Sequence, residues 1–308
     1  MQMKFGPGGN SESFRAAGYK SSLDMPGYLG QLGLSAYEYQ CNKGVKISEK
    51  SASILGENAE KFGICLSIHS QYYISLSSVE EEKRRKSVDY IMQCMHIAKV
   101  MGADRIVVHS GSAGKISRQL ALELAKDTLQ KALIQADSEG YSDIHICPET
   151  MGKINQLGTL EEVIELCKLD ERLIPTIDFG HLNARTMGNL KKPEAFAEIL
   201  SAIENHLGYD RLKVFHSHFS KIMYSAGGEI KHLTFEDTQY GPSFEPLAEL
   251  VAQKNLAPRF ICESAGTQTE DALTMKNMMK KVIDNESFRD ERTESEYARD
   301  SGAGYLWA

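Results

Sequence analysis

The sequence predicts a closed (β/α)8 barrel, a TIM barrel of the α/β class, formed by one domain over residues 1–285 of a 308-residue chain. Short apolar segments alternate with amphipathic segments, the pattern of a parallel sheet covered by helices. Eight such units in about 285 residues fit a closed barrel better than an open doubly wound sheet. No GxGxxG motif follows the first apolar segment, which argues against a dinucleotide-binding fold.

The predicted elements follow one another along the chain in regular alternation. The strands are expected at residues 3–6, 36–40, 64–69, 105–109, 144–149, 174–179, 212–218 and 259–263. The clearest helices are expected at 79–101, 116–138, 193–206, 244–254 and 269–284. The remaining segment, 286–308, is polar and aperiodic, so we expect a loosely held C-terminal tail.

Composition limits the classes of function. A hydrophobic content of 42% and a charged content of 25% are typical of a soluble globular protein, and a net charge of −7 argues against non-specific coating of nucleic acid. The N-terminus "MQMKFGPGGN" lacks the layout of a signal peptide, so a cytoplasmic protein is expected. We also expect no membrane partner and a monomeric state. The six scattered cysteines form no CxxC pair and are expected to be buried thiols rather than metal ligands.

Six successive predicted strands end in a histidine, aspartate or glutamate. In a TIM barrel these strand ends converge on one face, where active sites are built. The residues are His69, His109, Glu149, Asp178 with His181 just beyond it, His216 with His218, and Glu263.

Imidazole nitrogens combined with carboxylate oxygens suit Zn²⁺ or Mn²⁺, and clustered carboxylates repel one another unless cations neutralise them. Each residue alone has a structural alternative, because His69 could be a core histidine and Asp178 could cap a helix. Six such coincidences at equivalent strand ends are improbable, so the pattern favours a metal site. By contrast, we interpret three other histidines as structural, namely His96, His145 and His206.

The motifs "SIHSQYY", "IVVHSGS", "CPETMGK", "TIDFGHLNA", "FHSH" and "ICES" occur in the order and spacing of endonuclease IV. The chain resembles this metal-dependent apurinic/apyrimidinic endonuclease family, within the xylose-isomerase-like superfamily, from about Met3 to Asp284. The resemblance implies two or three zinc ions, with Mn²⁺ as an alternative. It implies that His69 and His109 hold one ion and that Glu149 bridges to a second, which Asp178, His216 and Glu263 complete. His181 and His232 would hold a third ion.

The sequence departs from that family in the segment 219–242, which includes a ligand position, and in the loop after the second strand, which has Lys43 and Lys46 but no arginine. In "AGGEIKHLTF", Ile230 stands where the family has an aspartate ligand, and Glu229 could substitute if the loop is rearranged. The long segment 219–242 also differs from the family's usual loop. On the DNA-facing side, the resemblance implies that Tyr72 is a wedge at the lesion, and Tyr73 could stack beside it. Lys43 lies in the loop that contacts DNA in the family.

Two enzyme functions and one binding function are compatible with these residues. The first is a zinc-dependent phosphodiesterase that cleaves DNA 5′ to abasic sites in base excision repair by a metal-activated water, with Glu149 and Glu263 as catalytic residues. The alternative is a sugar isomerase or epimerase with a single metal held by Glu149, Asp178, His216 and Glu263. The additional histidines at 69, 109, 181 and 232 favour the phosphodiesterase, and the intact first two sites argue against a barrel that only binds a ligand.

Overall fold

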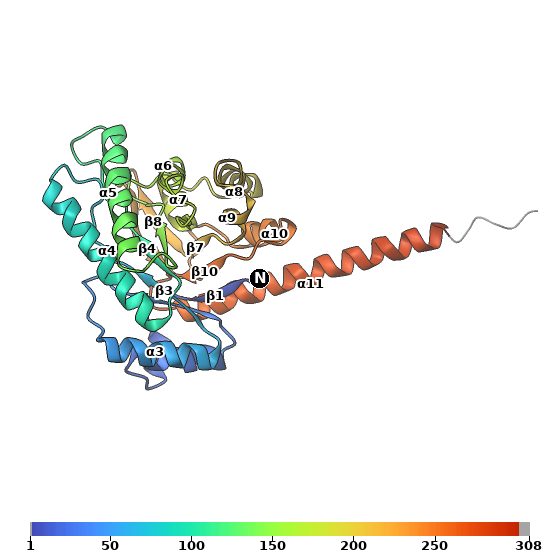
Figure 1. Cartoon of the computed structure of the whole chain (residues 1–308). Coiled ribbons are helices and arrows are strands. Elements are labelled where there is room, and N and C mark those ends of the chain that lie inside the picture. Colours follow the sequence, from blue (N-terminus) through green and yellow to red (C-terminus); the bar gives the residue numbers. More distant parts are fainter. Residues whose placement is uncertain (1, 302–308) are drawn as a thin grey trace, which may run out of the picture.

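The computed structural model describes residues 2–301, with side chains described through residue 285, and it has the predicted closed parallel barrel (Figure 1). Two four-stranded sheets have the orders β1-β10-β7-β6 and β2-β3-β4-β5. Parallel bridges from Gly8 to Glu38 and from Glu149 to Thr176 join these sheets at both seams. The barrel strands are β1 (Lys4–Pro7), β2 (Ala36–Gln40), β3 (Cys65–His69), β4 (Arg105–Val108), β5 (His145–Pro148), β6 (Thr176–Asp178), β7 (His216–Phe219) and β10 (Arg259–Cys262).

The helices surround the barrel, and several of them begin at a side chain that caps their N-terminus. Ser48 caps the N-terminus of α3 and Gly63 ends it in the left-handed region, while Thr159 and Glu162 form a capping box on α6. The helices are α1 (Glu12–Ala16), the 3-10 turn η1 (Ser22–Asp24), α2 (Met25–Gln31), α3 (Glu49–Phe62), α4 (Glu81–Met101), α5 (Arg118–Ser138), α6 (Leu160–Cys167), α7 (Phe179–Arg185), α8 (Pro193–Leu207), α9 (Tyr209–Lys213), α10 (Glu245–Gln253) and α11 (Gln268–Ser301).

The chain around β7 differs from the sequence-based expectation. The strand expected at 212–218 begins only at His216, because residues 209–213 form the short helix α9. After β7, the chain forms an antiparallel hairpin of β8 (Lys221–Ser225) and β9 (Gly228–Leu233), which the sequence analysis did not predict. This hairpin occupies much of the unusual segment 219–242 and packs against α7.

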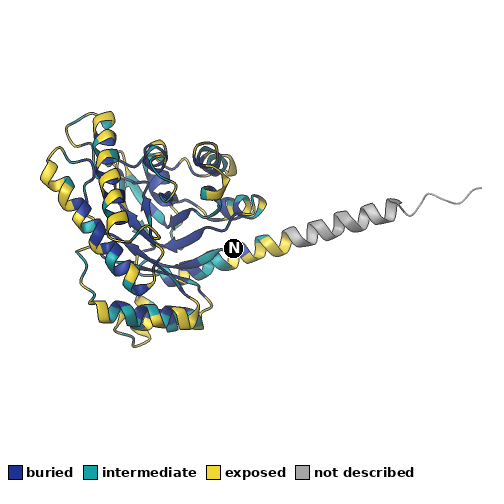
Figure 2. Ribbon diagram, in the orientation of Figure 1, coloured by how far each residue is buried: buried dark blue, intermediate teal, exposed yellow. Residues whose placement is uncertain are grey.

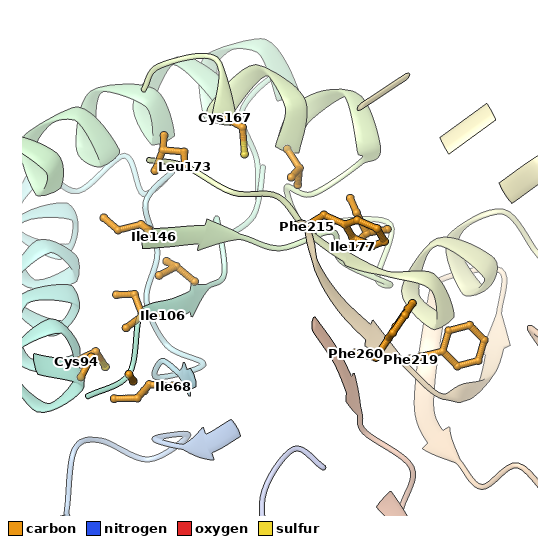
Figure 3. Close-up of a cluster of buried hydrophobic side chains, with 14 of the residues drawn as sticks. Ile68, Cys94, Ile106, Ile146, Cys167, Leu173, Ile177, Phe215, Phe219 and Phe260 are labelled. Atoms are coloured by element: carbon orange, nitrogen blue, oxygen red, sulfur yellow. The ribbon is translucent and has the colours of Figure 1, made fainter. Parts of the chain in front are cut away.

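The apolar core lies between the barrel and its helices. Figure 2 shows buried strands at the centre and helices exposed on their outer faces. Figure 3 shows part of this core, where Ile106 of β4 and Ile146 of β5 lie in one cluster with Cys94 of α4 and Cys167 of α6. Because side chains alternate along a strand, the neighbours of these isoleucines face the barrel interior.

The barrel interior is unusually polar. A small apolar cluster around Val107 and Cys147 is separate from the main core, and charged residues lie elsewhere inside. At the N-terminal ends of the strands, the guanidinium of Arg259 donates to both oxygens of Asp104 at 2.8 and 3.0 Å. Arg259 and Arg105 together hold the pKa of Asp104, whose side chain is 47% exposed at this end of the barrel, well below its usual range.

The other expectations concern the termini and the cysteines. Helix α11 continues past residue 285 to Ser301, and the rest of the expected tail, 302–308, lies outside the described residues. All six cysteines are free thiols, five of them buried as predicted and Cys65 partly exposed. Within the part of the chain that the structure describes, no helix has both the length and the hydropathy needed to cross a bilayer.

Candidate metal centre

The C-terminal ends of the strands surround a cavity of about 600 Å³. The predicted residues His69, His109, Glu149, His181 and Glu263 line it, as do Glu229 and His232 from the hairpin. Further polar side chains that the sequence analysis did not single out also line it, among them Asn10, Gln40, Asn42, Lys153, Gln156 and Gln268. The predicted convergence of strand ends therefore exists in the folded chain.

Glu149 lies at the centre of this site and is completely buried. It directly follows β5, and its backbone amide donates to the carbonyl of Val108 on the neighbouring strand. The carboxylate contacts four imidazoles, at 3.0 Å to His109, 2.9 Å to His218, 3.4 Å to His69 and 3.5 Å to His181. The two oxygens of Glu149 therefore lie between histidines that come from four different parts of the barrel.

Two groups of ligand atoms meet at Glu149. His69, His109 and Glu149 form the first, and Glu149, Asp178, His218 and Glu263 form the second. Within each group the ligand atoms lie within 4.8 Å of one another. These groups match the two implied ion sites except for one histidine.

That exception is His216, for which the structure requires a correction. His216 lies one layer deeper in the barrel, fully buried, where its Nε2 is 2.9 Å from Glu38 Oε2. His218, two residues later on the same face of β7, is in register with Asp178 and contacts both Glu149 and Glu263. Side chains alternate along a strand, so both histidines point into the barrel. They differ only in how far each lies from the C-terminal mouth of the barrel.

Asp178 has the two roles that the sequence analysis treated as alternatives. Its Oδ1 accepts a hydrogen bond of 2.7 Å from the backbone amide of His181. Through this bond Asp178 caps the N-terminus of α7. Its Oδ2 is buried without a hydrogen-bond partner, and the residue belongs to the second ligand group. The cap fixes the carboxylate's orientation, and the second oxygen remains available to a cation.

A third group combines His181, Glu229 and His232. Glu229 Oε2 is 3.4 Å from His181 Nε2, and Glu229 Oε1 is 3.9 Å from His232 Nε2. The neighbouring Ile230 is 52% exposed and does not face the site. The hairpin docks where a Cβ on Gly228 would meet the carbonyl oxygen of Gly152 at 2.2 Å, so only glycine permits this approach.

The electrostatics of the site depend on its carboxylates. Burial disfavours charge on His69, but Glu149 beside it raises the pKa of the imidazole to about 9. Burial has the same effect on His181, where Asp178 and Glu149 raise the pKa to about 9. Burial also opposes ionisation of Glu149, yet His218 and the other imidazoles hold its pKa well below its usual range. These carboxylates therefore require positive charge beside them.

Several observations fit a divalent cation as the source of that charge. Glu149 Oε2 and Asp178 Oδ2 are buried and accept no hydrogen bond. Each group combines imidazole nitrogens with carboxylate oxygens, the donor set that zinc and manganese take once the imidazoles lose their protons. None of the groups of ligand atoms among residues 2–285 includes a cysteine sulfur, as expected from the scattered thiols.

The predicted DNA-contacting residues border the mouth. Tyr72 is 59% exposed and lines the cavity, and its ring meets that of Tyr73 edge-on with centroids 5.5 Å apart. Lys43 is exposed in the loop after β2, which contacts the tyrosine loop through a hydrogen bond from the Tyr72 amide to the Asn42 carbonyl. These loops form an exposed, partly aromatic rim beside the ligand groups.

Comparison with known proteins identifies the family to which the chain belongs. A family model described as xylose isomerase-like TIM barrel matches residues 28–282. The uncharacterized protein MJ0133 of Methanocaldococcus jannaschii is 31% identical over 80% of this chain and 88% of its own length. A probable endonuclease 4 of Mycoplasma pneumoniae is 27% identical over 69% of this chain and 71% of its own, which confirms the resemblance to endonuclease IV. A solved D-tagatose 3-epimerase-like protein superposes with a TM-score of 0.69 at 22% identity, covering 93% of this chain and all of the other. The chain belongs to the xylose isomerase-like TIM barrel family.

Proposed function

We propose that the protein is a zinc-dependent phosphodiesterase that cleaves DNA 5′ to abasic sites, as part of base excision repair. The observation that carries this proposal is the arrangement of three ligand groups around Glu149. A single-metal isomerase has no use for His69, His109, His181 and His232, whereas a multinuclear hydrolase needs ligands of this kind. Similarity to a probable endonuclease 4 supports the same assignment.

The chain's own residues would hold the ions and orient the phosphodiester. His69, His109 and Glu149 would hold one ion, and Asp178, His218 and Glu263 would hold a second that shares Glu149. Divalent ions in such a pair lower the pKa of a bound water and stabilise negative charge on a phosphate. Glu263, with a side chain 17% exposed at the cavity wall, is placed to accept a proton from the attacking water.

The loops at the mouth would provide the contacts to DNA. The exposed Tyr72 would insert at the lesion, with Tyr73 stacking behind it and Lys43 near a phosphate. Lys153 adds a cation to the cavity wall itself. These few local cations would compensate for the overall net charge of −7 at the binding face.

An epimerase acting on a small sugar is the second candidate. It is favoured by the four-residue group of Glu149, Asp178, His218 and Glu263, which alone suffices to hold one ion. The polar cavity lining and the similarity of fold to a D-tagatose 3-epimerase-like protein are compatible with it. In this candidate function, the third group in the hairpin would contact the sugar rather than an ion.

A nicking assay distinguishes the two functions. Protein purified without chelator is incubated with a duplex that carries one abasic site, and with the same duplex without the lesion. We expect a single cut 5′ to the site, abolished by EDTA and restored by Zn²⁺ or Mn²⁺. Failure to cut the abasic duplex, together with metal-dependent interconversion of ketohexoses, would replace the phosphodiesterase by the epimerase. A cytoplasmic location and a monomeric state remain predictions.

A further inference from the structure

A buried carboxylate, Glu38, lies inside the barrel beneath the candidate metal centre. It comes from the middle of β2, where it is in register with Ser67 of β3, one inward-facing layer below Gln40 and His69. It is completely inaccessible to solvent. An ion of this size loses several kcal/mol of hydration when buried, so its position requires specific partners.

Those partners come from β3 and β7. Glu38 Oε2 accepts hydrogen bonds of 2.9 Å from the hydroxyl of Ser67 and 2.9 Å from Nε2 of His216. Its other oxygen, Oε1, lies 3.0 Å from Nε2 of His218, a buried nitrogen that forms no hydrogen bond in this ring orientation. The carboxylate therefore connects a deep histidine with one that belongs to the second ligand group.

The two ring nitrogens of His218 face opposite directions. Nδ1 lies 2.9 Å from Glu149 Oε1 and 3.5 Å from Glu263 Oε2, within the ligand group, while Nε2 faces Glu38 below. An imidazole binds a metal through one nitrogen while the other carries its proton, and the acceptor of that proton fixes the tautomer and the ring orientation. Glu38 Oε1, 3.0 Å from this buried and otherwise unpartnered nitrogen, is placed to be that acceptor.

We propose that Glu38 is a positioning residue, which holds His218 as the Nε2–H tautomer and directs its Nδ1 at the ion shared with Asp178 and Glu263. The inference rests on the proposed metal centre but not on the identity of the substrate. His216 supports the same arrangement from the other side, because it binds the second oxygen of Glu38 and keeps the carboxylate from rotating.

The carboxylate's ionisation agrees with this role. Burial works against its charge, but His218 and His216 hold the pKa of Glu38 well below its usual range. Burial also lowers the pKa of His216 to about 4, so that histidine is neutral and acts as a hydrogen-bond donor. The buried group is thus a fixed negative charge directly behind the ligand.

Two variants test the proposal, with a third as a matched control. Glu38→Met keeps most of the volume but removes the acceptor, and Glu38→Gln keeps an acceptor oxygen but removes the charge. Glu162→Gln is the control, because Glu162 is also a buried carboxylate but pairs with Arg118 outside the barrel, at 2.6 and 2.7 Å. Circular dichroism and amide spectra establish that each variant is folded.

The first readout is zinc affinity, measured by competition with a chromophoric chelator. Removing such an outer partner weakens metal binding by about 10- to 100-fold. We expect the upper end of that range for Glu38→Met and the lower end for Glu38→Gln, at one zinc equivalent only. The other equivalents and the Glu162→Gln control should be unchanged.

The second readout is the tautomer of His218 in long-range ¹H–¹⁵N spectra of the zinc-loaded protein. The wild type should show the Nε2–H form, and Glu38→Met should show a mixture of tautomers or a displaced ring. A folded Glu38→Met variant with unchanged affinity and an unchanged His218 spectrum would overturn this inference alone. A wild type that binds no zinc would overturn the proposed metal centre as well, so the two failures are distinguishable.

Discussion

Replacing Glu149 with glutamine removes the charge on which the candidate site is centred. In the metal-free protein burial disfavours charge on His69, but Glu149, with smaller contributions from Glu38 and Glu263, raises the pKa of His69 from an ordinary 6.5 to about 9. A histidine whose pKa is raised in the folded state stabilises the fold fully below the unfolded pKa, and the contribution disappears as the pH rises through the folded value. At about 1.4 kcal/mol per pH unit, His69 contributes roughly 3 kcal/mol below pH 6.5, roughly 2 kcal/mol at pH 7.5, and almost nothing at pH 10.

The assay is urea unfolding in EDTA at pH 7.5 and pH 10. We expect Glu149→Gln to lower the free energy of unfolding at pH 7.5 by up to about 2 kcal/mol through His69, because the imidazole loses its main counter-ion. At pH 10 the difference should shrink, since His69 is then neutral in the wild type and its contribution is lost. The more exposed Glu165→Gln, which loses only ion pairs with Lys126 and Lys168, should change stability by less than about 1 kcal/mol at either pH. A Glu149→Gln protein as stable as the wild type at pH 7.5, or destabilised more at pH 10, would refute this reasoning.

Three further outcomes are expected. Zinc binding at pH 7.5 should release about three protons per chain, from His69 and His181 with their pKa values of about 9 and from His218, whose pKa is raised well above its usual range. Calorimetry in buffers of different ionisation enthalpy would measure them, and binding without proton release would contradict those pKa shifts. Tyr72→Ala should raise KM for abasic duplex about tenfold or more, because stacking on an exposed aromatic side chain provides about 1–3 kcal/mol, and an unchanged KM would remove Tyr72 from the interface. Glu229→Gln should lower the zinc content by one equivalent relative to the wild type in elemental analysis, whereas an unchanged content would exclude Glu229 as a ligand.

The sequence was sufficient to predict the barrel and the convergence of its strand ends. Buried parallel strands appear as apolar runs, and the residue that ends each run must lie at the C-terminal face. Glu149, Asp178 and Glu263 follow this rule and share one ligand group. The capping role of Asp178 was also visible in the sequence, but the fact that one carboxylate both caps a helix and faces the site was not.

The depth of β7 in the barrel could not be predicted. His216 and His218 are two residues apart and point inward together, so only the register with β6 and β10 shows that His218 reaches the mouth. The position of Glu229 could not be predicted either, because it lies in a β-hairpin that the sequence did not indicate. The register of that hairpin shifts at a bulge between Met223 and Tyr224, opposite Glu229. Glu38 is the hardest case, because a glutamate within "AYEYQ" resembles an outward-facing residue, and its partner His216 lies 178 residues further along the chain.

Anomalous diffraction at the zinc edge, on crystals of protein purified without chelator, tests the central claim most directly. We predict two strong peaks on either side of Glu149, about 3.5–4 Å apart, one beside His69 and His109 and the other beside Asp178, His218 and Glu263. A further peak beside Glu229 would complete the third group. A single peak at Asp178, His218 and Glu263, with the two remaining groups without metal, would contradict the multinuclear centre and with it the proposed phosphodiesterase.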